Sequence, residues 1–356
     1  MPRVTPSASR QVTPAAFLTP ALACLLLVLA AGIAELVART EAVRAALGAP
    51  SVGSPSRLFE QQLDSLDRYA ASEQRLDCIV LGNSTALMGV DPDALSRAYH
   101  ERMGHGLRCF TFGVAGMTAS AAGAVAPILV ERHRPWLLIY AASVRDVGQS
   151  VDGPLLASTP WVQYRQGTFS LAGWLTEHSA AFRWYLLYRQ WVDPVRWRVA
   201  SGPLRTTPAG FMRFDPGMAL SPALWEQTQC TYAEIINQPP SQLELAGFSR
   251  LLELSGNGTQ VVVVEAPVHE TLRGWTRHVN DFYANATAHM RQAVRQQRVP
   301  FWRVATWRVV PAEGWADFVH LNPRGAARFS EWLGARIAAA VQKGRLKAPH
   351  ATPAQS

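Results

Sequence analysis

Lysine is almost absent from this sequence: Lys343 and Lys347 are the only two, and arginine carries nearly all of the positive charge. The 34 basic residues outnumber the 26 acidic ones, which gives a formal net charge of +8, but the arginines are scattered along the chain. Nucleic-acid binding needs a clustered basic patch, so we expect no nucleic acid partner. A diffuse positive charge favours attraction to an anionic membrane surface or polymer instead.

Charged residues are also scarce, at 17% of the chain against 48% hydrophobic residues, which excludes a disordered or coiled-coil protein and predicts a sizeable core. The four cysteines have the spacing of neither a zinc site nor a disulfide scaffold, and they do not decide the compartment. Cys78 and Cys109 fall in predicted strands, where we expect each to pack as a free, small hydrophobic residue. The sequence lacks a metal-ligand cluster, a phosphate loop and a dinucleotide fingerprint, so we predict no cofactor and no metal.

The longest hydrophobic run covers residues 15–38 and contains no charge before Glu35. At about 1.5 Å per residue, roughly 20 such residues cross the hydrocarbon core of a bilayer, so we predict a transmembrane helix. A cleaved signal peptide and a lipoprotein box at Cys24 are the alternatives. The run is longer than a signal peptide needs, and it continues past Cys24. Residues 1–14 then form a cytoplasmic tail.

Positive charges flank this run on both sides. Arg3 and Arg10 precede it, while Arg39 and Arg44 follow it, so the positive-inside signal is balanced. We predict a single-pass protein of the inner (cytoplasmic) membrane whose catalytic domain lies in the periplasm or outside the cell.

Short apolar segments alternate with helical patterns in the rest of the chain. The predicted strands lie at residues 77–81, 107–112, 136–141, 260–265 and 300–304. Among the predicted helices, two begin at Asp91-Pro92 and Asn322-Pro323, each an N-cap followed by proline. The alternation indicates an α/β fold with a parallel sheet covered on both faces, in which ligands bind beyond the carboxyl ends of the strands.

The predicted strands also divide the chain into parts. These are a helical stalk at 39–75 with a break at 48–55, two halves of one α/β domain at 76–146 and 241–342, and a disordered tail at 343–356. Between the halves lies an insertion, 147–240, which holds six of the twelve tryptophans. An insertion of this length is usually a lid or a subdomain. We expect most of its tryptophans to be local core, with one or two available to stack on a sugar or line an acyl pocket.

A short polar turn, Gly82-Asn83-Ser84, follows the first predicted strand. Gly82 allows a tight turn and places Ser84 at the strand end, where backbone N–H groups can bind an oxyanion. Ser84 is therefore a candidate nucleophile if a general base lies nearby, and Asn83 is a candidate substrate contact. Alternatively, a serine in such a turn merely caps a helix.

Near the C-terminus, Asp317 and His320 lie three residues apart, a spacing that can place both on one side of a turn. The carboxylate then accepts a hydrogen bond from one imidazole nitrogen and leaves the other nitrogen free to act as a base. The alternative is a surface Asp–His pair ahead of a capped helix.

Together, the Gly-Asn-Ser turn and the Asp-x-x-His segment resemble the SGNH (GDSL-like) hydrolase and acyltransferase superfamily, over about residues 77–145 and 260–340. The resemblance implies a three-layer α/β/α sandwich with a flavodoxin-like parallel sheet. It implies a catalytic triad of Ser84, His320 and Asp317. It also implies an oxyanion hole formed by Ser84 and by the backbone N–H of Gly113, with a third donor from the segment after the third strand.

That third segment departs from the family's pattern, because Arg145 stands where the family has the asparagine of the oxyanion hole. A guanidinium presents several fixed donors, so Arg145 is a candidate for the oxyanion hole or for binding an anionic donor or substrate. In the alternative interpretation Arg145 pairs with Asp146, and the hole lacks one donor, which lowers a rate by about 10²–10³.

The N-terminal anchor and the Ser-x-Arg-Asp segment resemble the membrane-attached branch that modifies cell-envelope polymers, including the alginate O-acetylation and D-alanyl transfer proteins. The segment Glu265–His269 is similar to that branch as well, which makes His269 a candidate substrate contact or a structural turn residue. The resemblance implies an O-acyltransferase with a polysaccharide or glycan acceptor and an acyl donor delivered by a membrane-bound O-acyltransferase. The alternatives are a carbohydrate esterase or deacetylase, and a non-catalytic polysaccharide-binding scaffold.

Overall fold

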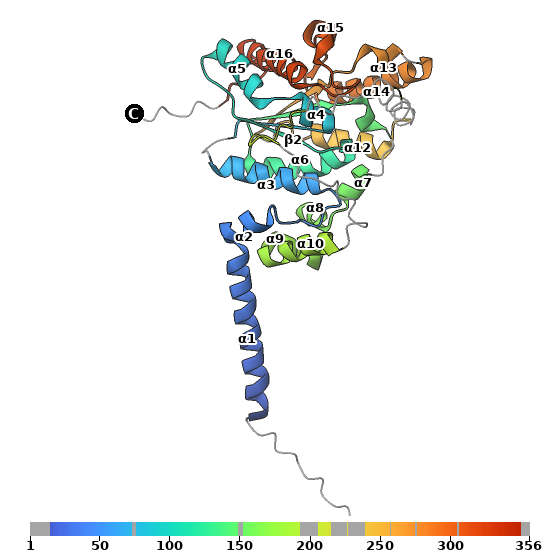
Figure 1. Ribbon diagram of the computed structural model, residues 1–356. Helices are drawn as coiled ribbons and strands as arrows, with labels where there is room; N and C mark the ends of the chain where they lie inside the picture. The colour runs from blue at the N-terminus through green and yellow to red at the C-terminus, as the bar shows by residue number, and fades with distance from the viewer. Residues whose placement is uncertain are drawn as a thin grey trace, which may run out of the picture.

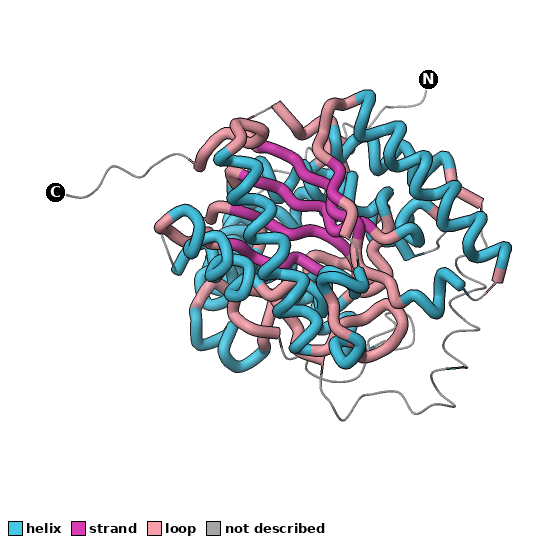
Figure 2. The backbone as a smooth tube through the Cα atoms, turned by 90° about the horizontal axis from the view of Figure 1, so that it is seen from above, coloured by secondary structure: helices cyan, strands magenta, loops and turns pink. Residues whose placement is uncertain are grey.

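The computed structural model describes residues 15–72, 76–148, 152–192, 206–214, 226, 239–256, 258–274, 276–304 and 306–349. At its centre lies a five-stranded sheet (Figure 2). Its strands are β1 (Cys78–Gly82), β2 (Cys109–Gly113), β3 (Leu137–Ala142), β4 (Gln260–Glu265) and β5 (Phe301–Trp302). All neighbouring strands are parallel, in the order β2-β1-β3-β4-β5. This is a doubly wound, flavodoxin-like order, so the predicted parallel sheet is confirmed.

The strands are apolar throughout because both faces of the sheet are covered. Successive side chains of a strand point to opposite faces. In β1, Ile79 and Leu81 therefore join one core cluster, whereas Cys78 and Val80 join the other. Burial on both faces explains why the sequence shows continuous apolar runs at the strands instead of alternation with polar residues.

A layer of helices packs on each face (Figure 1). One layer contains α5 (Pro92–Met103) and α16 (Pro323–Gln342). The other contains α3 (Arg57–Ser72), α6 (Ala119–His133), α12 (Gln242–Leu252) and α14 (Arg277–Gln296). Shorter helices lie in the connections: α4 (Ser84–Gly89), η1 (Val144–Val147), α13 (Glu270–Gly274), α15 (Thr306–Val309) and η3 (Ala312–Gly314). The three-layer arrangement is as predicted.

The two predicted helix caps are present. The carboxylate of Asp91 accepts hydrogen bonds from the backbone N–H groups of Asp93 and Ala94 at the start of α5. The side-chain oxygen of Asn322 accepts two in the same way at the start of α16. In both helices proline occupies the first turn, where a missing N–H leaves no hydrogen bond unmade.

Cys78 and Cys109 form a disulfide, which corrects the prediction that both are free. They pair directly across β1 and β2, with their Cα atoms 4.5 Å apart. The sequence predicts the two strands but not their register, and only the register brings these two side chains together. Cys24 is a free cysteine and lies exposed on α1.

The predicted break between two helices in residues 39–75 is present, between α2 (Glu41–Leu47) and α3. The prediction that the whole interval is a stalk is wrong for α3, because Phe59, Leu63 and Leu66 are buried in the core. Residues 58, 59, 62, 63 and 66 follow the spacing of one helix face, and this face packs on the sheet.

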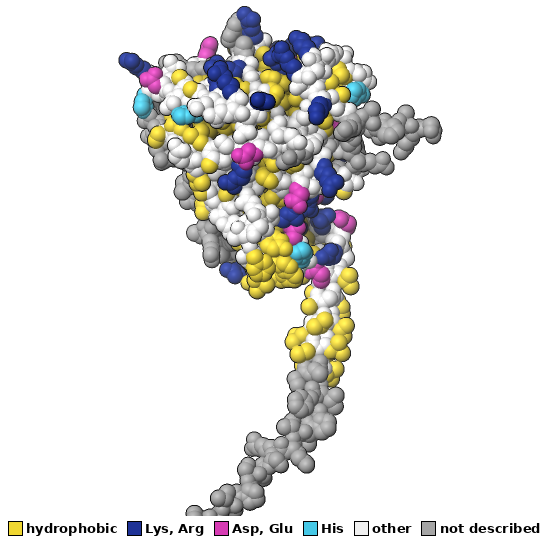
Figure 3. Space-filling model, turned by 180° about the vertical axis from the view of Figure 1, so that it is seen from behind, with side chains coloured by type: hydrophobic (Ala, Val, Ile, Leu, Met, Phe, Trp, Pro, Cys, Tyr) yellow, Lys and Arg dark blue, Asp and Glu magenta, His cyan; other side chains and the backbone are white. Residues whose placement is uncertain are grey.

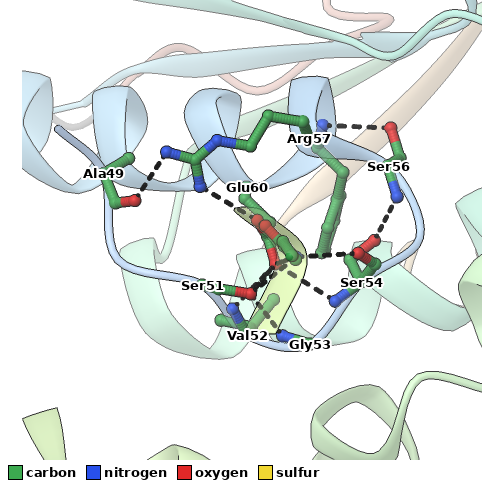
Figure 4. Close-up of polar contacts among 10 residues, drawn as sticks. Ala49, Ser51, Val52, Gly53, Ser54, Ser56, Arg57 and Glu60 are labelled. Atoms are coloured by element: carbon green, nitrogen blue, oxygen red, sulfur yellow. Dashed lines mark hydrogen bonds and ion pairs between the residues drawn. The ribbon is translucent and has the colours of Figure 1, made fainter. Parts of the chain in front are cut away.

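The loop between α2 and α3 is organised around the buried carboxylate of Glu60 (Figure 4). Glu60 accepts hydrogen bonds from the backbone N–H groups of Val52 and Ser54, at 3.0 and 3.1 Å, and pairs with Arg57 at 3.0 Å. Gln190 donates to the same carboxylate from a distant helix. Burial raises the pKa of Glu60, and these donors compensate its charge.

That distant helix belongs to the predicted insertion, 147–240, whose described helices are α7 (Asp152–Ala157), α8 (Pro160–Arg165), α9 (Leu171–His178) and α10 (Ala180–Val192). They lie beyond the layer of α3 and α6, on the side away from α5 and α16 (Figure 1). Trp161 is buried and packs near Phe59, as predicted for the local core, whereas Trp174 and Trp191 are exposed. Trp197 and Trp225 lie outside the described residues, as does much of the segment predicted as a lid.

Two further segments pack against the sheet. Residues 206–214 cover β2: Thr111 donates its N–H to the carbonyl of Ala209 at 2.9 Å, which removes part of an open strand edge. The predicted disordered tail is ordered where it begins. Leu346 is buried, and the indole of Trp136 donates to the carbonyl of Lys347 at 3.0 Å. Residues 350–356 lie outside the described residues.

Helix α1 covers Ala15–Ala38, the bounds predicted for the transmembrane helix, and projects away from the α/β domain (Figure 1). Among the described residues, no helix taken alone has the length and hydropathy of a membrane span. Residues 22–38 meet that test only together with α2, across a 69° bend. The helix itself is therefore present, and its insertion into a membrane stays a prediction.

Candidate active site

Ser84 lies at the carboxyl end of β1, between β2 and β3, where the strand order of the sheet reverses. Gly82 permits the turn: a Cβ there would lie 2.8 Å from the carbonyl oxygen of Ala141 on the neighbouring strand. Asn83 then caps α4, because its side-chain oxygen accepts a hydrogen bond from the N–H of Thr85 at 2.7 Å. The cap places Ser84 in the first turn of α4, where the residue is mostly buried and lies at the carboxyl end of β1.

Asp317 and His320 lie in a tight turn ahead of α16. The turn is closed by an antiparallel bridge between Trp315 and Leu321. One carboxylate oxygen of Asp317 accepts from the backbone N–H groups of Val319 and His320, at 2.8 and 2.7 Å. The other oxygen lies 2.6 Å from Nδ1 of His320. The short spacing therefore folds the carboxylate back onto the imidazole, as predicted.

The turn meets the end of β1, and Nε2 of His320 lies 2.8 Å from Oγ of Ser84, across 236 positions of the sequence. A carboxylate only accepts hydrogen bonds, so Nδ1 of His320 carries the proton and Nε2 accepts from the hydroxyl. The three residues that the sequence singled out thus form one continuous Ser–His–Asp chain of hydrogen bonds. Such a chain can withdraw the serine proton during nucleophilic attack.

Asp146, which the sequence reading left with a minor role, is buried beneath this chain. Its carboxylate accepts hydrogen bonds from the side chain of Asn83 at 2.7 Å, from the hydroxyl of Tyr140 at 2.8 Å and from the N–H of Ser143 at 2.9 Å. Burial raises the pKa of Asp146 to about 7, against these donors and the charge of Arg145, which lower it. An acid directly after β3 and opposite the Gly-Asn-Ser turn was the signal for this network.

The same network includes Asn83, which the sequence suggests as a substrate contact. That residue is buried, with its oxygen on the N–H of Thr85 and its nitrogen on Asp146. It is placed to hold the serine turn against the end of β3, and its role as a substrate contact stays a prediction.

Gly113 and Arg145, the two candidates that would complete the oxyanion hole, flank the serine turn. A Cβ on Gly113 would lie 2.5 Å from the backbone of Leu87 in α4, so only glycine allows β2 to approach that helix so closely. Arg145 is half-buried in η1 and donates its backbone N–H to the hydroxyl of Ser143 at 3.3 Å. Their roles as oxyanion donors stay predictions.

His269 lies in the connection after β4 and packs against the catalytic turn. Its N–H donates to the carbonyl of Phe318 at 2.8 Å, and its ring stands edge-on to Trp315 with centroids 5.3 Å apart. Burial lowers the pKa of its imidazole. These contacts match the structural alternative for His269, and its role as a substrate contact stays a prediction. Among the described residues, no group of three or more His, Cys, Asp or Glu side chains is placed to hold a metal ion.

Neither a protein-family model nor a curated protein matches this chain. Solved structures do. A lipase/acylhydrolase from Enterococcus faecalis is 16% identical over 78% of this chain and 100% of its own, with a TM-score of 0.38. A GDSL-like lipase from Bacteroides thetaiotaomicron is 11% identical over 80% and 99%, with a TM-score of 0.36. Est24, a carbohydrate acetylesterase from Sinorhizobium meliloti, is 12% identical over 74% and 99%, also at 0.36.

Proposed function

We propose that this chain is a serine-dependent O-acyltransferase of the SGNH type, which acts on a cell-envelope or extracellular polysaccharide. One observation carries the enzymatic part of the proposal: Oγ of Ser84, the imidazole of His320 and the carboxylate of Asp317 are connected by hydrogen bonds of 2.8 and 2.6 Å. Three residues of these types in this order have the geometry of a nucleophile, its base and the group that orients the base.

In the first half-reaction His320 takes the proton of Ser84 as Oγ attacks the carbonyl carbon of the acyl donor. The tetrahedral intermediate collapses, the donor's oxygen leaves with the proton from His320, and the acyl group remains on Ser84. In the second half-reaction His320 removes a proton from a sugar hydroxyl, whose oxygen attacks the acyl-serine; the ester bond to Ser84 then breaks, and His320 returns the proton to Oγ. The backbone N–H groups of Ser84 and Gly113 and the guanidinium of Arg145 are the proposed donors to the oxyanion.

Hydrolysis is the second candidate, because water in place of the sugar hydroxyl turns the same triad into an esterase or deacetylase. The polysaccharide acceptor and an acyl donor supplied by a membrane-bound O-acyltransferase rest on the sequence resemblance and on the predicted N-terminal membrane anchor. Transfer is the first candidate, because the resembled branch modifies polymers of the cell envelope, which is the compartment proposed for this chain.

The proposed location is the inner membrane, with the α/β domain in the periplasm or outside the cell. The disulfide between Cys78 and Cys109 supports this side of the membrane, because disulfides persist in oxidising compartments and are rare in the cytosol. Alkaline phosphatase fused after Ser356 should be active in cells. An inactive fusion, expressed at normal level, would reverse the orientation.

Labelling with a fluorophosphonate probe tests the enzymatic part. The full chain in mild detergent should gain one probe mass, and Ser84→Ala should gain none. A wild-type protein that stays unlabelled while folded would favour a non-catalytic scaffold.

To separate transfer from hydrolysis, the protein is given p-nitrophenyl acetate with and without an oligosaccharide acceptor. Acetylated oligosaccharide in excess of free acetate is the result expected for a transferase.

A further inference from the structure

Helices α9 and α10 expose apolar side chains at their outer surface, which Figure 3 shows as a yellow group at the base of the α/β domain. We call this surface the α9–α10 patch. Its members are Phe169, Leu171, Trp174, Tyr185, Tyr188, Trp191 and Val192, which are between 42% and 74% exposed. A soluble surface rarely gathers so many large apolar side chains, and a group of this kind marks a contact with something outside the chain.

The two helices carry large apolar side chains on their outward faces, unlike ordinary surface helices, whose apolar residues turn inward. On α9 the inward residues are Gly173 and Thr176, whereas Leu171 and Trp174 face outward. On α10 the two buried residues are Leu187 and Gln190, and the amide of Gln190 donates to the buried carboxylate of Glu60. The outward apolar face is therefore not a core left partly uncovered, because the faces that pack on the domain carry their own specific contacts.

The patch lies directly beside the end of α1, and hydrogen bonds fix the two together. The carboxylate of Glu35 accepts from the N–H groups of Ala180 and Ala181 at the start of α10, at 2.8 and 3.1 Å. The indole of Trp184 donates to the carbonyl of Ala38 at 2.9 Å. Leu36 is 70% exposed, so the apolar surface of α1 continues to the point where α10 begins (Figure 3).

The composition of the patch suits the boundary between lipid tails and headgroups. Tryptophan and tyrosine concentrate at that boundary because each joins an apolar ring to a polar group that stays hydrated. Arg189 is exposed on the same helix and donates to the hydroxyl of Tyr185 at 3.2 Å, which places a cation where anionic headgroups would lie. A second protein would have to cover this surface while passing around the adjoining α1.

We propose that the α9–α10 patch rests in the interfacial layer of the same bilayer that α1 enters, so that the chain contacts the membrane through α1 and through the patch. This inference rests on the proposed membrane anchorage of α1 and goes beyond it. The patch would hold the α/β domain at a fixed tilt, with the α3–α6 layer toward the membrane and the α5–α16 layer away from it. In this arrangement helices α9 and α10 of the insertion are a membrane support and not a cover over Ser84.

The test uses the full chain in vesicles of phosphatidylethanolamine and phosphatidylglycerol. Cys24→Ser and Cys230→Ser remove the other reactive thiols, and single cysteines are introduced by Tyr188→Cys, Phe169→Cys or, as a matched control on the opposite layer, Arg97→Cys. Each is labelled with an environment-sensitive fluorophore. We expect blue-shifted emission, quenched by headgroup-proximal spin-labelled lipids, at positions 188 and 169 and not at position 97.

Vesicle flotation separates failure of the anchor from failure of the patch. A protein that floats but whose labels at 188 and 169 behave like the label at 97 overturns the inference and leaves the anchor intact. A protein that does not float at all overturns both. Blue-shifted emission at positions 188 and 169 only at a high protein-to-lipid ratio, together with cross-linking between two chains through Tyr188→Cys, would assign the patch to a second copy. That result would overturn the inference as well.

Discussion

The Ser84–His320 site and the α9–α10 patch differ in which side chains they bury: the site buries polar groups, and the patch exposes apolar ones. At the site, the side chains of Asn83 and Asp317 are buried and hydrogen-bonded: Asn83 to Asp146, and Asp317 to His320 and the turn behind it. At the patch, large apolar groups are exposed while the inward faces of the same helices carry polar contacts such as Gln190 on Glu60. Buried polarity is tolerated only when hydrogen bonds compensate it, whereas exposed apolar surface points to a contact beyond the chain.

The sharpest contrast is between chemistry and stability at Ser84. Ser84→Ala removes the nucleophile, and kcat on a simple ester such as p-nitrophenyl acetate should fall by about 10⁴–10⁶. The hydroxyl contributes one partly exposed hydrogen bond, so thermal unfolding should shift little. Wild-type turnover in the variant would show that another group is the nucleophile.

His320→Ala should lower kcat by a similar factor, and Asp317→Asn by the same factor or less, because the carboxylate only orients the imidazole and stabilises its charged form. The double variant should be no slower than the slower single one, since the three residues act as one unit. Measured kcat values for the three variants decide this. Losses that multiply would mean that Asp317 and His320 act independently in spite of their 2.6 Å contact.

Arg145→Ala should lower kcat by about 10²–10³ with little change in KM if the guanidinium donates to the oxyanion. Arg145→Asn, which restores the residue of the resembled family, should keep or raise simple esterase activity. A loss confined to KM would assign Arg145 to an anionic substrate instead. Unchanged kcat and KM in a stable Arg145→Ala protein would remove both functions.

Asp146 extends the comparison to pH. Burial raises its pKa to about 7 from an ordinary 3.8, so between these values the folded protein holds a proton that the unfolded chain has lost. The group therefore stabilises the fold most below about pH 4, and that contribution is lost as the pH rises through about 7.

Asp146→Asn does not titrate and presents an N–H₂ to donors, which should destabilise the fold by about 1–3 kcal/mol. The difference in unfolding free energy between wild type and variant should narrow from pH 4 to pH 7. Tyr140→Phe, which removes one donor and keeps the acid, serves as the control, and a constant difference would contradict a raised pKa.

The fold was largely predictable because its signals are local. Strand runs such as residues 260–265, and caps such as Asp91-Pro92, depend on neighbours in the sequence, and the structure has them at the predicted places. Ser84, Asp317 and His320 were found for a similar reason, as two short segments of distinctive spacing. What was missed depends on register or packing: the Cys78–Cys109 disulfide needs the pairing of β1 with β2, and the burial of Asn83 on Asp146 needs the approach of β1 to β3.

The smallest expected effect lies on the patch, and α10 offers a matched pair for it. Tyr188 faces outward and Gln190, two residues later, faces inward onto Glu60. Tyr188→Ser should change the unfolding free energy in detergent by less than about 0.5 kcal/mol and leave kcat on a soluble ester unchanged, because no buried group loses a partner. Gln190→Ala leaves the carboxylate of Glu60 short of a donor and should destabilise the fold by about 1–3 kcal/mol. Denaturant titrations of both variants measure the two values side by side. Equal losses would mean that Tyr188, like Gln190, belongs to the core of the domain, and that α10 has no separate outward apolar face.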